Sequence, residues 1–217
     1  MKNSIWVAGC HAAGPGFAGE TERRDGLATV AQSQEEIKRV VAMAEGVSLT
    51  ATNALLVAKR AGTSSVGFGV VAREMRGFSG RLVQTMQDLM LRVYALVEAE
   101  AVRMQRVRNM GKLCRACKGG EGAMRHLDGA CGRSREALQM QASRLLALQA
   151  SLLEALARAE KQCAMGVAVG RGARIEAAHS GGCEQELRQI AADMEGAVGG
   201  LIEGVRKLRK TAAGGMA

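Results

Sequence analysis

The stretch NALLVAKRAGTSSVGFGVVAREMR, from Asn53 to Arg76, contains a short break between two segments of helix-like spacing. Apolar residues recur every three or four positions on both sides of GTSSVG, residues 62–67. Glycine readily adopts the left-handed conformation that ends a helix, so Gly62 and Gly67 mark the two ends of a turn. The stretch therefore predicts two helices joined by a turn at 62–67.

Heptad spacing extends outward from this turn and recurs in four runs along the chain. The intervening breaks are rich in glycine and lie at 117–122, near Gly170 and at 180–183. The resulting helices are expected at about 19–62, 67–111, 122–168 and 183–211. Residues 1–18 are expected to form a disordered N-terminal tail.

These runs predict an all-α protein. The first two helices are long and nearly equal, so they are expected to form an antiparallel hairpin, a coiled coil over residues 19–112. Two further amphipathic helices lie in 120–212. A hairpin alone buries one seam, and four such helices close a four-helix bundle. The four helices of the bundle can come from one chain, or two hairpins from two chains can pair in a homo-oligomer. The sequence leaves both arrangements open.

The composition agrees with helices. The chain of 217 residues is 47% hydrophobic but only 2% aromatic, and Pro15 is its only proline. Strands favour β-branched and aromatic residues, whereas this chain is rich in the small and straight-chain residues that favour helices. No uninterrupted apolar run approaches the length of a membrane span, and the N-terminal run is too short for a secretory leader. We therefore expect no membrane span and a cytoplasmic location.

The net charge of +9 is concentrated in part of the chain. Residues 81–118 contain eight basic and three acidic residues, and a second basic cluster lies at Arg206, Lys207, Arg209 and Lys210. Such a distribution is typical of a solvated helix face, and it would also suit a nucleic-acid-binding surface at 81–118 and 206–210. Nucleic acid is therefore kept as an alternative partner.

The chain offers little for catalysis or for a cofactor. Its only metal-like spacing is formed by Cys114, Cys117, His126 and Cys131, and it lacks the second close ligand pair of most zinc sites. These thiols are interpreted as core or loop residues, and Cys163 falls on a heptad core position. No histidine has the neighbours that acid–base or nucleophilic catalysis requires. We expect no enzyme activity, no cofactor and no metal.

Residues 46–82, GVSLTATNALLVAKRAGTSSVGFGVVAREMRGFSGRL, resemble the cytoplasmic signalling tip of bacterial chemoreceptors, the methyl-accepting chemotaxis proteins. The ordered string RAG-x4-GF-x-VVA-x-E-x-R carries the resemblance, which covers about a sixth of the chain. In that family the break is the tip turn of a long antiparallel hairpin. The resemblance implies a cytoplasmic interaction protein of chemotaxis signal transduction that docks, helix against helix, to chemoreceptors, the coupling adaptor or the histidine kinase.

On this resemblance the partner-binding residues at the tip are Asn53, Arg60, Phe68, Glu74 and Arg76. Alternatively, Phe68 could pack between the two helices of the hairpin next to the turn. The family carries glutamate where this chain has Val57 and Thr63, which puts kinase control in doubt. A purely structural coiled coil is the third interpretation that the sequence allows.

Overall fold

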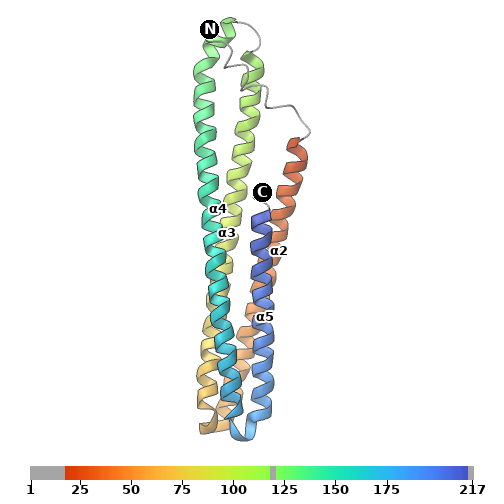
Figure 1. Cartoon of the computed structure of the whole chain (residues 1–217), viewed down its shortest axis with the longest axis vertical. Helices are drawn as coiled ribbons and strands as arrows, with labels where there is room; N and C mark the ends of the chain where they lie inside the picture. The colour runs from red at the N-terminus through yellow and green to blue at the C-terminus, as the bar shows by residue number, and fades with distance from the viewer. Residues whose placement is uncertain (1–17, 118–120, 215–217) are drawn as a thin grey trace. The chain divides into compact units, whose positions relative to one another are not determined.

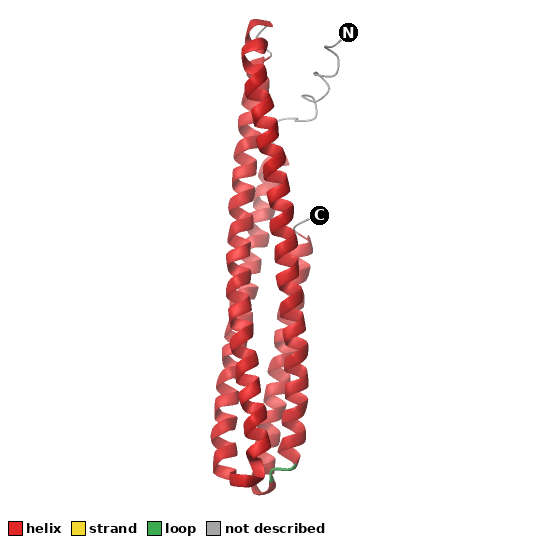
Figure 2. Cartoon of the chain, turned by 90° about the vertical axis from the view of Figure 1, so that its left-hand side faces the viewer, coloured by secondary structure: helices red, strands yellow, loops and turns green. Residues whose placement is uncertain are grey.

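The computed structural model describes residues 18–117 and 121–214, with side chains over 30–116, 129–181 and 183–213. Four long helices account for nearly all of these residues (Figures 1 and 2). Their bounds are α2, Ala18–Ala61; α3, Val66–Cys117; α4, Glu121–Ala178; and α5, Glu184–Gly214. Two short 3-10 helices, η1 (Gly62–Ser65) and η2 (Gly181–Cys183), precede α3 and α5. The all-α prediction is confirmed.

The chain divides into two compact units. One, here called the four-helix unit, comprises Thr29–Val93 and Leu152–Ala217. The other, the α3–α4 unit, comprises Met1–Ala28 and Tyr94–Ser151. Helices α3 and α4 each contribute residues to both units. The predicted disordered tail, except for Ala18, lies outside the described residues.

The four-helix unit consists of two hairpins from the same chain. Hairpin 1 is Thr29–Val93, with η1 at its turn, and hairpin 2 is Leu152–Gly214, with η2 at its turn. Residues from the heptad runs form the core of this unit, and its largest fully buried side chains include Phe68, Phe78, Ile37, Met75, Leu82, Met86, Leu89, Leu187, Met194 and Leu201. Of the two arrangements that the sequence left open, the bundle closed within one chain is therefore the one observed.

Small residues bring the helices of this unit close together. A Cβ atom added to Gly166 would lie 2.6 Å from Cζ of Phe78, and one added to Gly204 would lie 2.6 Å from Cγ2 of Val40. The buried hydroxyl of Ser79 donates a hydrogen bond to the carbonyl of Ala44 within hairpin 1. Close approach of this kind fills the interior in a chain that has few aromatic side chains.

Two predicted helix boundaries were wrong. The break expected near Gly170 is absent, because α4 runs without interruption from Glu121 to Ala178. A Cβ on Gly170 would lie 3.1 Å from Cγ of Glu195, so this glycine permits helix contact and does not make a turn. Helix α3 likewise continues past Gly111 to Cys117. Glycine inside a helix costs only about 1 kcal/mol, which a long packed helix tolerates.

Between Tyr94 and Ser151, the described residues of the α3–α4 unit form a pair of helices. Its buried residues include Ala99, Cys131 and Leu145. Across the pair, the buried amide of Gln141 donates a hydrogen bond of 2.7 Å to the carbonyl of Ala99. Few of the other residues of this unit are buried, since two helices cover only one face of each other.

One apolar stretch of helix between Val30 and Ala116 would be long enough to cross a membrane, judged by length and composition only. Its mean hydropathy reaches 1.5, and 33% of that window is buried. Core residues such as Val40, Val47 and Ala51 lie within α2 on the face that packs inside the four-helix unit. A core helix of a bundle satisfies the same criterion.

Candidate functional site

The turn predicted from the opening stretch lies at one end of the four-helix unit, beside the turn of hairpin 2 (Figure 1). Gly62 has φ +74° and Gly181 has φ +61°, and these are the positive-φ residues of the described chain. Side chains with a Cβ rarely adopt this conformation, so each turn depends on glycine at its first residue. Each of these glycines is the first residue of a 3-10 helix.

Serine hydroxyls join the two turns. Ser64 and Ser65 of η1 donate hydrogen bonds of 3.2 and 3.4 Å to the carbonyl of Ser180, directly before η2. Ser65 and Ser180 are buried, whereas Ser64 is exposed. The side chain of Ser180 donates in turn to the carbonyls of Glu176 and Ala177 at 2.8 and 2.9 Å. The two turns therefore form one hydrogen-bonded end of the bundle.

Gly67 does not belong to the turn, which is a correction to the predicted range 62–67. The 3-10 segment ends at Ser65, and Gly67 is the second residue of α3 with a helical backbone. A Cβ at this position would lie 1.9 Å from Oε2 of Glu176. Gly67 therefore lies against the carboxylate of Glu176 on α4 and does not change the chain direction.

Four of the five predicted partner-binding residues lie on the surface near this end. Asn53 and Arg60 are exposed on α2, and Glu74 and Arg76 are exposed on α3. The Arg60 guanidinium lies 3.7 Å from Oε1 of Glu186 on α5, with both side chains more than half exposed. A pair of this kind contributes about 0–1 kcal/mol, so Arg60 can exchange it for another partner at little cost.

Phe68 is fully buried, so the structure gives it the packing role and not a surface contact. Its placement among the partner-binding residues is corrected accordingly. The departures from the chemoreceptor pattern also have distinct environments: Val57 is buried and Thr63 is exposed in η1. Valine suits the buried position, where an unpaired glutamate would lose its hydration.

Several exposed apolar residues on either side of the first turn, here called the exposed apolar group, were not predicted from the sequence. Leu56, Val66 and Val70 are 58%, 62% and 46% exposed. Leu49, which is also exposed, lies earlier on α2 and farther from the turn. These side chains point away from the core at positions between the heptad core residues. The sequence contained a signal for these residues. Each of them lies outside the heptad core positions, and polar residues are expected there.

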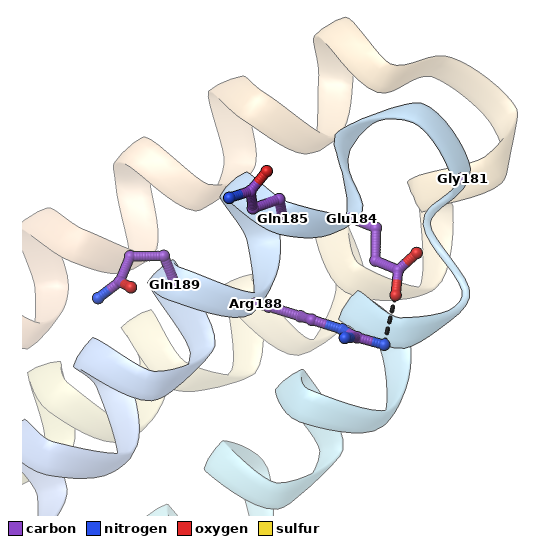
Figure 3. Close-up of a pocket in the computed structure, with 5 residues that line it drawn as sticks. All are labelled: Gly181, Glu184, Gln185, Arg188 and Gln189. Carbon is purple, nitrogen blue, oxygen red and sulfur yellow. Dashed lines mark ion pairs between the residues drawn. The ribbon is translucent and has the colours of Figure 1, made fainter.

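The corresponding region of hairpin 2 is polar. A shallow depression there is lined by Gly181, Glu184, Gln185, Arg188 and Gln189, and Arg188 forms an ion pair with Glu184 (Figure 3). The two glutamine side chains and the ion pair offer hydrogen-bonding groups. On α4, beside this turn, Ile175 is the exposed apolar side chain.

The predicted basic surface is divided between the two units. Arg81 and Arg92 belong to the four-helix unit, whereas the described basic residues from Arg103 to Arg115 belong to the α3–α4 unit. In the cluster at 206–210, Lys207 bonds to the buried carboxylate of Glu36, and Arg209 lies 2.7 Å from Glu160. Acidic neighbours therefore neutralise part of this cluster. The structure does not join the two predicted segments into one surface within a single unit.

Two of the four residues with metal-like spacing have described side chains. Cys114 is half-buried on α3 and Cys131 is buried on α4. The side chains of Cys117 and His126 lie outside the described ones. Among the residues whose side chains are described, no three His, Cys, Asp or Glu residues group closely enough to hold a metal ion.

Cys163 occupies the core position that the heptad pattern predicted, at 1% exposure. Burial, together with the nearby Glu160 carboxylate, raises the pKa of its thiol from 9.0 to about 11. The reactive thiolate is therefore disfavoured in the folded protein. This cysteine acts as a small apolar core residue.

No family model, no curated protein and no solved structure matches this chain.

Proposed function

We propose that this chain is a cytoplasmic interaction protein of chemotaxis signal transduction, which docks other helical signalling proteins at the end of the four-helix unit that carries Gly62. The observation that carries this proposal is the exposed apolar group Leu56, Val66 and Val70 beside that turn. Apolar side chains grouped on a surface are typical of a protein contact. The resemblance of residues 46–82 to the chemoreceptor signalling tip supplies the class of partner.

The surrounding polar residues suit such a contact. Asn53, Glu74 and Arg76 are exposed, and Arg60 has only a weak ion pair to give up. The docking partner would lie on the helices of hairpin 1, with the apolar residues excluding water and the polar residues fixing the register. No step of this mechanism requires a catalytic group or a cofactor.

The test is co-purification of the tagged full chain with three defined proteins from its own cell, the chemoreceptor, the coupling adaptor and the histidine kinase. We expect retention of at least one of them at moderate salt. Asn53→Ala with Arg60→Ala should weaken retention while circular dichroism shows unchanged helicity. His179→Ala is the matched control, because His179 is exposed beside the other turn. Absence of all three proteins from the wild-type sample would refute the proposal.

Charge favours nucleic-acid binding as a second candidate function. Residues 94–151 contain ten basic and five acidic residues, a net charge of +5, and Arg108, Lys112, Arg115, Arg133 and Arg144 are exposed. Contacts to phosphates would release counterions, so affinity for a DNA or RNA duplex should fall steeply with salt. Binding that is absent at low salt, or unchanged by replacing Arg108, Lys112 and Arg115 with glutamine, would refute this function.

A further inference from the structure

The two hairpins of the four-helix unit correspond to each other at a constant separation of 119 residues. This separation carries Gly62 onto Gly181, the two positive-φ turn residues. Without a gap, it also pairs identical residues between positions 54 and 89. These pairs are Ala54/Ala173, Ala58/Ala177, Gly62/Gly181, Ala72/Ala191, Met75/Met194, Gly77/Gly196, Gly80/Gly199, Leu82/Leu201 and Leu89/Leu208.

Burial follows the same correspondence. Hairpin 1 has fifteen buried apolar residues from Ile37 to Leu89. Thirteen of them correspond to a buried residue of hairpin 2, and the other two counterparts, Glu176 and Ala197, are half-buried. The pattern holds even where the residues differ, as at Val47 and Gly166. The same positions therefore form the core in both hairpins.

Contacts between the hairpins repeat as well. On one side, the Thr85 hydroxyl donates a hydrogen bond of 3.0 Å to Oε1 of Gln162. The corresponding positions on the other side are Gly204 and Met43, and a Cβ on Gly204 would lie 3.4 Å from Cε of Met43. Equivalent pairs thus meet on both sides, as they would across the twofold axis of a symmetric dimer. One chain supplies both halves of this arrangement.

The outward faces of the two hairpins differ. Val66 and Val70 correspond to Gln185 and Gln189, which line the depression at the second turn. Leu49 corresponds to Ala168, and of the exposed apolar group only Leu56 has an apolar counterpart of similar size, Ile175. Hairpin 1 therefore carries exposed apolar side chains at the two α3 positions where hairpin 2 carries the amide side chains Gln185 and Gln189 (Figure 3), while hairpin 2 exposes Met165 and Ile175 on α4.

Charge separates the two faces further. Residues 45–81 of hairpin 1 contain five basic and two acidic residues, a net charge of +3. The corresponding residues 164–200 of hairpin 2 contain three basic and five acidic residues, a net charge of −2. A partner with acidic residues around an apolar stripe would be attracted to hairpin 1 and repelled by hairpin 2.

We propose that the four-helix unit is a duplicated hairpin with a single docking face, carried by Val66 and Val70 one helical turn apart on α3, which takes one helical hairpin whose apolar stripe is flanked by acidic residues. This inference rests on the proposed function and adds its stoichiometry and the chemistry of its partner. A symmetric dimer of one hairpin would present two such faces and could link partners together. This chain binds one partner and leaves its other side unoccupied, so it ends an assembly rather than extending it.

The test measures the binding of the full chain to the purified cytoplasmic signalling fragment of a chemoreceptor from the same cell, by titration calorimetry. We expect one fragment hairpin per chain, with affinity that decreases as salt is raised. The variant Val66→Gln with Val70→Gln gives hairpin 1 the residues of hairpin 2, and it should bind at least tenfold more weakly. Both positions are exposed, so circular dichroism should show an unchanged fold.

The matched control is Gln185→Ala with Gln189→Ala on hairpin 2, which should change the dissociation constant less than twofold. Two fragment hairpins per chain, or equal losses in the two variants, would overturn the single docking face. Affinity that is independent of salt would overturn the acidic partner. No binding by the wild-type chain would refute the proposed function and this inference together, whereas binding that is indifferent to Val66→Gln and Val70→Gln would refute this inference alone.

Discussion

Replacing Gly166 by alanine tests the closest contact between the two hairpins of the four-helix unit. The added Cβ would lie 2.6, 2.8 and 3.0 Å from three ring atoms of Phe78. Phe78 is only 2% exposed, so its ring has little free space into which to move. Overpacking of a filled core costs about 1–3 kcal/mol.

Alanine also favours the helix over glycine by about 1 kcal/mol, which offsets part of this cost. Gly196→Ala measures the gain in helix propensity alone, because Gly196 is exposed on α5 and no atom lies within 4 Å of an added Cβ. Gly196→Ala should stabilise the fold by about 0.5–1 kcal/mol. The two alanine variants should therefore differ in free energy of unfolding by about 1–3 kcal/mol, with Gly166→Ala the less stable.

The assay is denaturant unfolding followed by far-ultraviolet circular dichroism on the full chain. A double variant separates the ring contact from other effects: with Phe78→Leu in place, the extra cost of Gly166→Ala should shrink, since the ring is gone. Equal stabilisation by Gly166→Ala and Gly196→Ala would refute the argument that hairpin 2 is seated against Phe78.

Three further predictions concern the turn, a buried carboxylate and a buried thiol. Gly62→Ala should cost about 1–2 kcal/mol because φ is +74°, whereas Gly80→Ala, in open space on α3, should not destabilise; equal melting temperatures would contradict the turn. In thermal unfolding, Lys207→Met should destabilise the fold by about 1–3 kcal/mol more than Glu36→Gln does. Removing the lysine leaves the Glu36 carboxylate, whose side chain is 6% exposed, with Arg39 at 3.6 Å as its remaining cationic partner. The raised pKa of Cys163, about 11 against 9.0, means that the folded state retains a proton which the unfolded state loses. Its contribution, on the order of 1–3 kcal/mol, should be complete below pH 9 and be lost as the pH rises toward 11, and the thiol should react with iodoacetamide only after unfolding; rapid alkylation of the native chain at this site would contradict its burial.

Much of the fold could be predicted from local patterns. Heptad spacing identified most core residues of the four-helix unit, although Val107, on the same heptad run of α3, is 46% exposed. Gly62 marked the first turn, because helix periodicity and a positive φ are both properties of short segments. Gly170 and Gly67 were misinterpreted as turn residues for the same reason. A local pattern cannot distinguish a glycine that ends a helix from one that makes room for Glu195 or Glu176 on another helix.

The candidate site was predicted only in part. Asn53, Arg60, Glu74 and Arg76 are exposed as a contact surface requires, but Phe68 is buried and the apolar group Leu56, Val66 and Val70 was overlooked. Comparing the chain with itself at a separation of 119 residues would have related the two turns and drawn attention to Val66 and Val70 against Gln185 and Gln189. That signal is weak in identity and becomes convincing once burial is known.

By itself, the sequence determined that this protein is helical, where its heptad cores lie and that the chain reverses at Gly62. Only the tertiary structure decided which surface covers hairpin 1. An apolar stripe specifies that a helix must be covered, yet many amphipathic helices could cover it equally well. The choice of hairpin 2 depends on shape and charge between residues more than eighty positions apart, such as Phe78 against Gly166 and Glu36 with Lys207.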